Sequence, residues 1–199
     1  MTTNLNPFCG KLVRLATVDI DADSVLWARW SQNSEFQHLL DWGPISLPTV
    51  KQEKEWIEKE HGSMYHFAIH ALADDKTIGM LDLSDVNWTA GDAWLGIGIG
   101  DPDYWGKGYG SEAIDLLLRF GFEQLNLRRV SLTVFEYNER ACKSYLKLGF
   151  KEEGRARQML NRFDRRWDMI YMGILRQEWE EHTAMDKTES QEGEIKWLK

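Results

Sequence analysis

The sequence predicts a single α/β (α+β) domain with a mixed, mostly antiparallel sheet and flanking helices, and three observations lead to that class. A length of 199 residues, 43% of them hydrophobic, is enough for one domain with its own core. Closely spaced strand-like segments between residues 65 and 99 favour an antiparallel meander. After residue 100 the pattern changes to a glycine-rich turn, an amphipathic helix, a strand and a second helix.

Two helices and four strands are expected before residue 100. Apolar periodicity predicts the helices at 19–31 and 49–60, and the Gly- and Pro-containing segment 41–48 predicts a loop between them. The strands are predicted from the alternation of apolar and polar residues and from the turns at 74–76 and 89–92 that separate them. These strands are expected at residues 11–15, 65–70, 77–83 and 93–99.

The second half is expected to alternate helices and strands. A 3–4 apolar spacing predicts a helix at 111–122, and β-branched residues predict a strand at 129–134. The next helix, 138–148, is expected to end at Gly149, because glycine is favoured just past a helix C-terminus. Of the last two strands, the first is expected to begin at Phe150 and the second to span 167–172. A hairpin turn at 161–164 is expected between them.

Net charge and missing signals exclude several classes of protein. Thirty-two acidic against 24 basic residues give a net charge of −8, which disfavours a protein that coats nucleic acid. No signal peptide and no run of about 18 apolar residues is visible, so a cytoplasmic protein without a membrane partner is expected. Cys9, Cys142 and the five histidines show no ligand spacing, and no metal site is predicted.

The C-terminal segment differs in composition from the rest. Residues 178–199 contain seven acidic and three basic residues, which is half of the net charge. The organisation expected is therefore a domain over 1–180 and an acidic appendage over 181–199.

The glycine-rich turn over residues 106–110 is typical of an anion site. Glycines let backbone N–H groups converge, and the helix that follows adds unsatisfied donors and a positive dipole end. A P-loop is rejected, because Lys107 is followed by Gly108 and the glycine spacing is wrong. A dinucleotide fingerprint fits poorly, since the turn follows a meander rather than the first strand of a βαβ unit. A plain tight turn remains the simplest alternative.

Residues 104–113 (YWGKGYGSEA) resemble the acetyl-CoA pyrophosphate loop of the GNAT superfamily of N-acetyltransferases, closest to the branch of the ribosomal-protein N-terminal acetyltransferases. The family pattern Arg/Gln-x-x-Gly-x-Gly/Ala falls on Trp105, Gly108 and Gly110 and departs at its first position. Residues 138–150 (NERACKSYLKLGF) resemble a second family segment, and the likeness covers about residues 10 to 180.

The resemblance implies a GNAT fold, with a sheet splayed at the cofactor site, and acetyl-CoA as cosubstrate. The strand before the loop would hydrogen-bond the pantetheine, the loop would hold the pyrophosphate, and Asn138 would contact the pantetheine. The implied cofactor residues are Ile97, Gly98, Ile99, Trp105, Gly106, Lys107, Gly108, Tyr109, Gly110, Ser111 and Asn138.

The helix over 138–148 carries two of the implied roles on one face. Asn138, Cys142 and Tyr145 are spaced i, i+4 and i+7. Asn138 also fits a helix N-cap, and both roles are compatible. In the family pattern Tyr145 is the general acid for the departing CoA thiolate, which suits a phenol of pKa about 10. Cys142 is interpreted as a small core residue rather than a nucleophile.

The general base expected from the family is missing. Many members place a Glu where this chain has Trp94. Other acids lie near in sequence, and of these Glu136 is the preferred candidate. The others are Asp82, Asp85, Asp92 and Asp101. Because proximity alone contributes about 7–11 kcal/mol, a base is not strictly required.

The acceptor amine is left open. By analogy its pocket is formed by the N-terminal helices and the last hairpin, whose tryptophans and arginines also fit ordinary packing. These residues are Trp27, Trp30, Trp42, Trp56, Arg162, Arg165, Arg166 and Trp167. A protein N-terminal α-amine or a small-molecule amine is expected, the alternatives being a polyamine, an antibiotic or an amino acid. A CoA-binding regulatory module without turnover is a further alternative, and a homodimer is expected by analogy.

Overall fold

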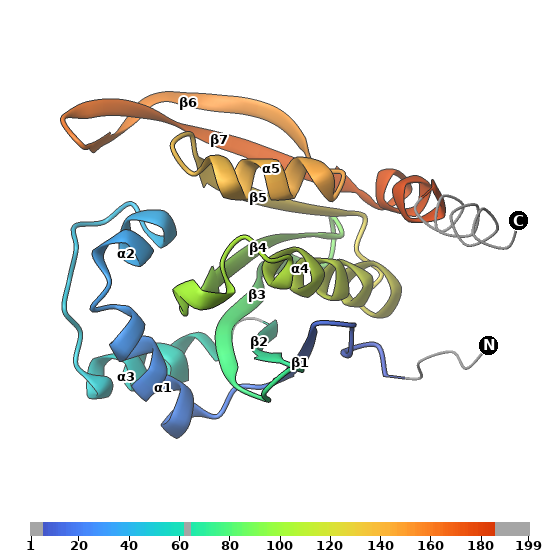
Figure 1. The fold of residues 1–199 in the computed structure, drawn as a ribbon. Helices are drawn as coiled ribbons and strands as arrows, with labels where there is room; N and C mark the ends of the chain where they lie inside the picture. The colour runs from blue at the N-terminus through green and yellow to red at the C-terminus, as the bar shows by residue number, and fades with distance from the viewer. Residues whose placement is uncertain (1–5, 62–64, 186–199) are drawn as a thin grey trace, which may run out of the picture.

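The computed structural model describes residues 6–61 and 65–185 (Figure 1). The elements up to residue 99 are β1 (Val13–Thr17), α1 (Ile20–Trp30), α2 (Ser34–Leu40), α3 (Val50–His61), β2 (Tyr65–Ala71), β3 (Thr77–Asn87) and β4 (Asp92–Ile99). Those that follow are η1 (Pro102–Tyr104), α4 (Tyr109–Arg119), η2 (Phe120–Gln124), β5 (Arg129–Phe135), α5 (Glu139–Lys147), β6 (Lys151–Arg162) and β7 (Arg165–Leu175).

A seven-stranded sheet in the order β1-β2-β3-β4-β5-β7-β6 forms the centre of the molecule. Neighbouring strands are antiparallel except β4 and β5, which are parallel and pair only from Asp92↔Arg129 to Trp94↔Ser131. In Figure 1 these two strands run side by side at one end and diverge toward the other. The expected fold class, a mixed and mostly antiparallel sheet with a splay, is confirmed.

Apolar side chains on the two sheet faces form separate cores. One face packs against α4 and η2, where Leu117 and Phe122 are completely buried beside residues of β1, β3 and β5. The opposite face packs against α1, α2 and α3 through Trp27, Phe36 and Ile57. The division follows from strand alternation, since successive side chains point to opposite faces.

Helix α2 was not predicted from the sequence. It has only seven residues, of which Phe36 alone is buried, so its apolar pattern is too short to show a helical period. The helix begins at Asn33, whose side chain accepts hydrogen bonds from the backbone N–H groups of Glu35 and Phe36. The predicted loop 41–48 therefore follows α2 directly.

Element boundaries differ from the prediction by a few residues elsewhere. The predicted helix 111–122 is α4 followed by one π-helical segment, η2. The final strands are longer than expected, and the β6–β7 turn consists of Phe163 and Asp164, both with φ of 55°. That conformation is a two-residue hairpin turn whose twist matches the strands beside it.

The predicted acidic appendage begins inside a helix. Residues 176–185 are helical, so the proposed boundary at 181 falls within an element. Trp179 anchors this helix, because it is buried with its ring 5.3 Å from that of Phe122. Residues 186–199 lie outside the described residues.

Candidate active site

The splay between β4 and β5 opens a cleft of about 550 Å³. From Leu95 onward β4 has no partner on its β5 side, so its backbone N–H and C=O groups on this side face the cleft. An extended ligand can satisfy such groups by pairing like an additional strand. Among the predicted pantetheine residues, Ile97, Gly98 and Ile99 all line the cleft.

The glycine at position 98 is explained by how closely neighbouring side chains pack against it. A Cβ there would stand 3.0 Å from both Trp27 Cη2 and Leu40 Cδ1, which is closer than ordinary contact. The glycine therefore lets α1 and α2 pack directly on the strand beside the cleft.

The glycine-rich turn places the start of α4 at one end of the cleft. Gly106 and Gly108 have φ of +70° and +91°, and Gly108 is the N-cap of α4 without a side-chain capping bond. Gly106, Gly108, Gly110 and Ser111 line the cleft. The first N–H groups of α4 are thus available to an anion, as the motif predicts.

Trp105 fixes the turn to the end of β4. Its indole Nε1 donates to the Ile99 carbonyl at 2.7 Å, and the Arg140 guanidinium lies 4.3 Å over its ring. The family's more usual Arg or Gln is therefore replaced by a side chain that joins β4, the turn and α5.

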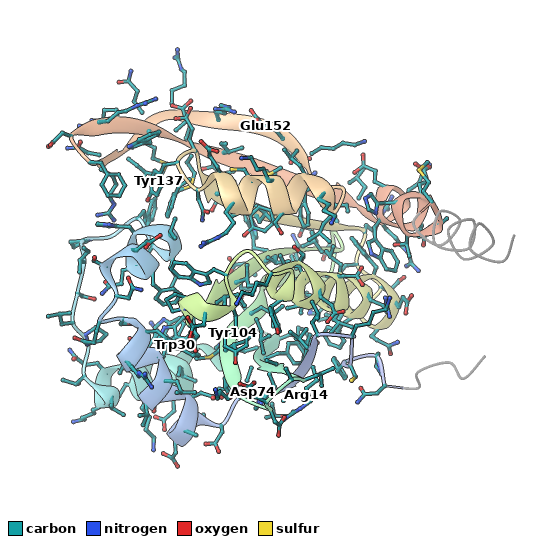
Figure 2. The ribbon with its side chains drawn as sticks, viewed as in Figure 1. Arg14, Trp30, Asp74, Tyr104, Tyr137 and Glu152 are labelled. Carbon is teal, nitrogen blue, oxygen red and sulfur yellow. The ribbon has the colours of Figure 1, made fainter. Side chains whose placement is uncertain are left out.

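Two predicted cofactor residues, Lys107 and Tyr109, are not among those that line the cleft. The Tyr109 ring instead packs edge-on against Tyr104, with centroids 5.0 Å apart. The Tyr104 hydroxyl donates to Asp74 Oδ2 at 2.7 Å, as the labelled side chains in Figure 2 indicate.

Helix α5 forms the opposite wall. Asn138 is its N-cap, with Oδ1 accepting from the Ala141 N–H at 3.2 Å, and it also lines the cleft, so the two suggested roles are compatible. Ser144 Oγ lies 2.7 Å from Ser111 Oγ and joins α5 to α4 across the cleft. Cys142 is half-buried beside the core, and burial raises the pKa of its thiol.

Tyr145 lines the cleft from the second turn of α5. Its side chain is buried, with the ring packed edge-on at 5.9 Å from Phe150. Burial, with a smaller effect from Cys142, raises the pKa of the phenol above its ordinary value. The hydroxyl is therefore protonated at neutral pH and can donate a proton.

Basic residues on α5 were missed by the sequence analysis. Arg140, Lys143 and Lys147 line the cleft near the glycine-rich turn. Their spacing of i, i+3 and i+7 places them on one helix face, and this was the available signal. They add positive charge to the cleft that the start of α4 also lines, and Lys143 Nζ lies 3.1 Å from Glu139 Oε2.

Glu136 does not reach the cleft. Its Oε2 accepts from the Asp168 backbone N–H at 3.2 Å, and Oε1 lies 3.4 Å from the Arg155 guanidinium. These contacts tie the end of β5 to β7 and β6, so the geometry does not favour Glu136 as the base. The residues that line the cleft include no Asp, Glu or His within the described part of the chain.

The β6–β7 hairpin reaches α2 across the far end of the cleft (Figure 1). Arg162 Nη2 donates to the carbonyls of Asp41 and Gly43, and the Tyr137 hydroxyl donates to the His38 carbonyl. Figure 2 shows Tyr137 between the hairpin and α2.

The residues predicted to form the acceptor pocket differ in burial: some are in the core and others are exposed to solvent. Trp27 and Trp30 are buried in the core under the sheet, whereas Trp42 and Trp56 are exposed. Arg165 and Arg166 are exposed on the hairpin, and the Arg165 guanidinium lies 4.0 Å over the Trp167 ring.

Comparisons with known proteins agree with this geometry. Residues 12–151 match the family described as "Acetyltransferase (GNAT) domain". The chain therefore belongs to the GNAT family and is an N-acetyltransferase.

Relatives with sequence similarity include several bacterial N-acetyltransferases. The chain is 30% identical over 127 residues to "SPbeta prophage-derived uncharacterized N-acetyltransferase YokL" of Bacillus subtilis, covering 64% of this chain and 71% of that protein. It is 32% identical over 139 residues to "Putative ribosomal N-acetyltransferase YdaF" of Bacillus subtilis, covering 69% and 75%.

A solved structure shares the fold. The spermidine N-acetyltransferase from Vibrio cholerae in complex with CoA and spermine has a TM-score of 0.75 and 23% identity, covering 85% of this chain and 99% of that one. Within the described residues, no helix is long and apolar enough to cross a membrane, and no group of three potential metal ligands occurs.

Proposed function

We propose that this protein transfers the acetyl group of acetyl-CoA to the α-amine of a peptide, by direct attack in a ternary complex. The observation that carries the proposal is the unpaired edge of β4, which adjoins the open N-terminus of α4 and faces the buried phenol of Tyr145. One cleft therefore offers a peptide-like backbone, an anion site and a proton donor.

The cofactor fits the groups that line the cleft. The backbone of Ile97 to Ile99 pairs with the pantetheine amides, and Asn138 contacts the same arm. The N–H groups of the turn from Gly106 to Ser111 bind the pyrophosphate, and the basic side chains Arg140, Lys143 and Lys147 add charge for the phosphates.

In the reaction the amine nitrogen attacks the thioester carbon, a C–N bond forms and the C–S bond breaks. Tyr145 gives its proton to the sulfur, and CoA leaves as the thiol. A covalent acetyl-cysteine step is not part of the proposal, because Cys142 is not among the cleft residues and burial raises its thiol pKa.

The surroundings of the cleft favour a peptide over a polycation. Arg162, Arg165 and Arg166 place three guanidinium groups on the hairpin at the acceptor end, and like charges repel. An α-amine of pKa about 8 is partly neutral at pH 7, so it needs little help to become a nucleophile.

A spermidine acceptor is the second candidate, and the comparisons supply its support. The chain is 38% identical over 81 residues to spermidine N(1)-acetyltransferase of Escherichia coli, covering 41% of this chain and 43% of that protein. The absence of a carboxylate at Trp94 motivates a third candidate, a CoA-binding module without turnover.

Release of free thiol from acetyl-CoA distinguishes these candidates. The assay compares short peptides with free N-termini, the same peptides with blocked N-termini, spermidine and a free amino acid. We expect release with the free peptides and none with the blocked ones. Spermidine as the sole acceptor would favour the second candidate, and tight acetyl-CoA binding without release would favour the third.

A further inference from the structure

The end of the β6–β7 hairpin is basic in a chain that is acidic overall. Residues 157–167 contain a single acid, Asp164, and four arginines, whereas the whole chain has a net charge of −8. The four are Arg157, Arg162, Arg165 and Arg166. Within residues 6–61 and 65–185 none of these four forms an ion pair, although Arg155 on the same strand has three acidic partners. The hairpin end therefore carries positive charge that the described part of the chain does not neutralise.

Arg162 joins this hairpin end to the wall of the cleft. Its Nη2 donates to the carbonyls of Asp41 and Gly43, in the loop just after α2. The Asp41 carboxylate is turned to the same loop and accepts from the Gly43 backbone N–H at 3.1 Å. Leu39 and Leu40, the last residues of α2, line the cleft. Because Asp41 follows Leu40 directly, the basic end of the hairpin adjoins the acceptor end of the cleft, on the side where Figure 1 shows α2.

Arg165 is on the same face of the hairpin as Arg162. The two residues are paired in the β6–β7 register, and the side chains of directly paired residues lie on one side of a sheet. Arg165 is exposed, and its guanidinium lies 4.0 Å over the Trp167 ring. Stacking on a ring occupies the face of a guanidinium and leaves the N–H groups at its edge available to a carboxylate. Arg165 is therefore a positioned cation on the face that leads to the cleft.

Aromatic side chains accompany these cations where the hairpin meets α2. The Phe163 ring packs edge-on at 5.2 Å from His38 and at 5.7 Å from Tyr137. Phe163 is still 62% exposed, and Trp42 in the loop after α2 is 63% exposed. Apolar surface beside a cation strengthens its attraction for a carboxylate, because less water screens the charge. This surface suits a peptide with acidic side chains and disfavours a free polycation.

We infer that the acceptor is a protein whose N-terminal segment carries acidic side chains, and that Arg165 binds them. The inference rests on the proposed acetylation of a peptide α-amine. With its amine at the thioester, the peptide leaves the cleft between α2 and the hairpin. A carboxylate a few residues after the amine then forms a bidentate pair with the Arg165 guanidinium. Arg165 is thus a specificity residue for the acceptor, without a part in the chemical step.

The test compares three peptides that share their first two residues and continue with three Glu, three Gln or three Arg residues. Thiol release gives kcat/KM for each. We expect kcat/KM for the Glu peptide to exceed that for the Arg peptide about tenfold, mainly through KM, because a charge pair at the rim of a site acts on binding. The preference should decrease with added salt, since exposed charges are screened.

Arg165→Glu in the full chain should reverse the preference, so that the Arg peptide becomes the better acceptor. The Kd for acetyl-CoA should stay within about twofold, because the substitution is at the acceptor end. Arg165→Gln should make the three peptides nearly equal. Lys51→Glu is the matched control, since it changes the net charge as much as Arg165→Glu does. Its side chain is 85% exposed on α3, which Figure 1 shows on the opposite side of the molecule from the hairpin, and the control should keep the wild-type preference.

Equal kcat/KM for the three peptides in the wild type, or a higher value for the Arg peptide, would overturn the inference and leave peptide acetylation standing. A preference for the Glu peptide that persists in Arg165→Glu, or that is lost to the same extent in Lys51→Glu, would overturn the assignment of Arg165. A wild-type protein that binds acetyl-CoA but acetylates none of the peptides would overturn the proposed function together with the inference.

Discussion

At the scale of single residues, the surroundings of Tyr145 decide its chemistry. A phenol on an exposed helix would titrate near pH 10, but burial raises the pKa of this one further. The raised pKa keeps the proton on oxygen over the whole physiological range. In the proposed mechanism, the phenol donates its proton only as negative charge develops on the CoA sulfur.

Replacing Tyr145 with Phe should lower kcat by about 10²–10⁴ and leave acetyl-CoA affinity nearly unchanged, because only the hydroxyl is removed. Steady-state kinetics and a binding titration check this. The wild-type rate should show no alkaline decrease from Tyr145 up to pH 10, since its pKa lies above that value. An unchanged kcat in the variant would exclude Tyr145 as the acid.

At the scale of elements, the conformation at the start of α4 suits the anion binding proposed for it. Gly108 has a left-handed φ of +91° and gives the helix no side-chain cap, so the N–H groups of its first turn have no partner from that residue. The same glycine sets the direction in which these groups point. Sequence spacing alone predicted this arrangement, because the motif requires both the turn and the helix.

Gly108→Ala should weaken acetyl-CoA binding about tenfold and lower the free energy of unfolding by about 1–2 kcal/mol, the cost of a left-handed conformation for a residue with Cβ. Isothermal titration and denaturant unfolding measure the two effects. Gly154→Ala is the control, since its Cβ would meet nothing within 4 Å. Equal effects of the two substitutions would contradict the account of Gly108.

At the scale of the whole molecule, buried acids on the face under α1 and α3 make stability depend on pH. Glu53 of α3 is buried and accepts a hydrogen bond from Ser31 Oγ at 3.0 Å, at the end of α1. Burial raises its pKa despite that bond, and burial likewise raises the pKa of Asp23. Folding thus favours the protonated forms, so their contribution to stability decreases as pH rises through the folded pKa values.

Glu53→Gln keeps an acceptor for Ser31 and removes the charge. The variant should be more stable than the wild type at pH 7, by an amount on the order of 1 kcal/mol, and the difference should shrink toward pH 4. Urea unfolding at several pH values measures it. Glu55→Gln on the exposed side of α3 should change stability little. A wild type that is the more stable at pH 7 would contradict this reasoning.

Local patterns account for much of what was predicted. The β1–β4 meander, α4, β5 and α5 follow from alternation, helical spacing and capping residues such as Asn138 and Gly149. Most residues of the proposed cofactor end were predicted and line the cleft, because they lie within two short segments, 97–111 and 138–145. Helix α2 was missed since seven residues show no period, and Lys107 and Tyr109 were assigned from motif position without knowledge of which side chains face the cleft.

The sequence by itself determined the family, and it singled out the glycine-rich turn and Tyr145 for the roles proposed above, because each depends on residues close together in the chain. Only the tertiary structure decided which acid is beside the unpaired edge of β4. Glu136 is near Asn138 in sequence but faces Arg155, whereas Asp82 is fourteen residues before Gly96 and adjoins it through the β3–β4 register. Strand pairing brings distant residues together, and no local period encodes which ones will meet.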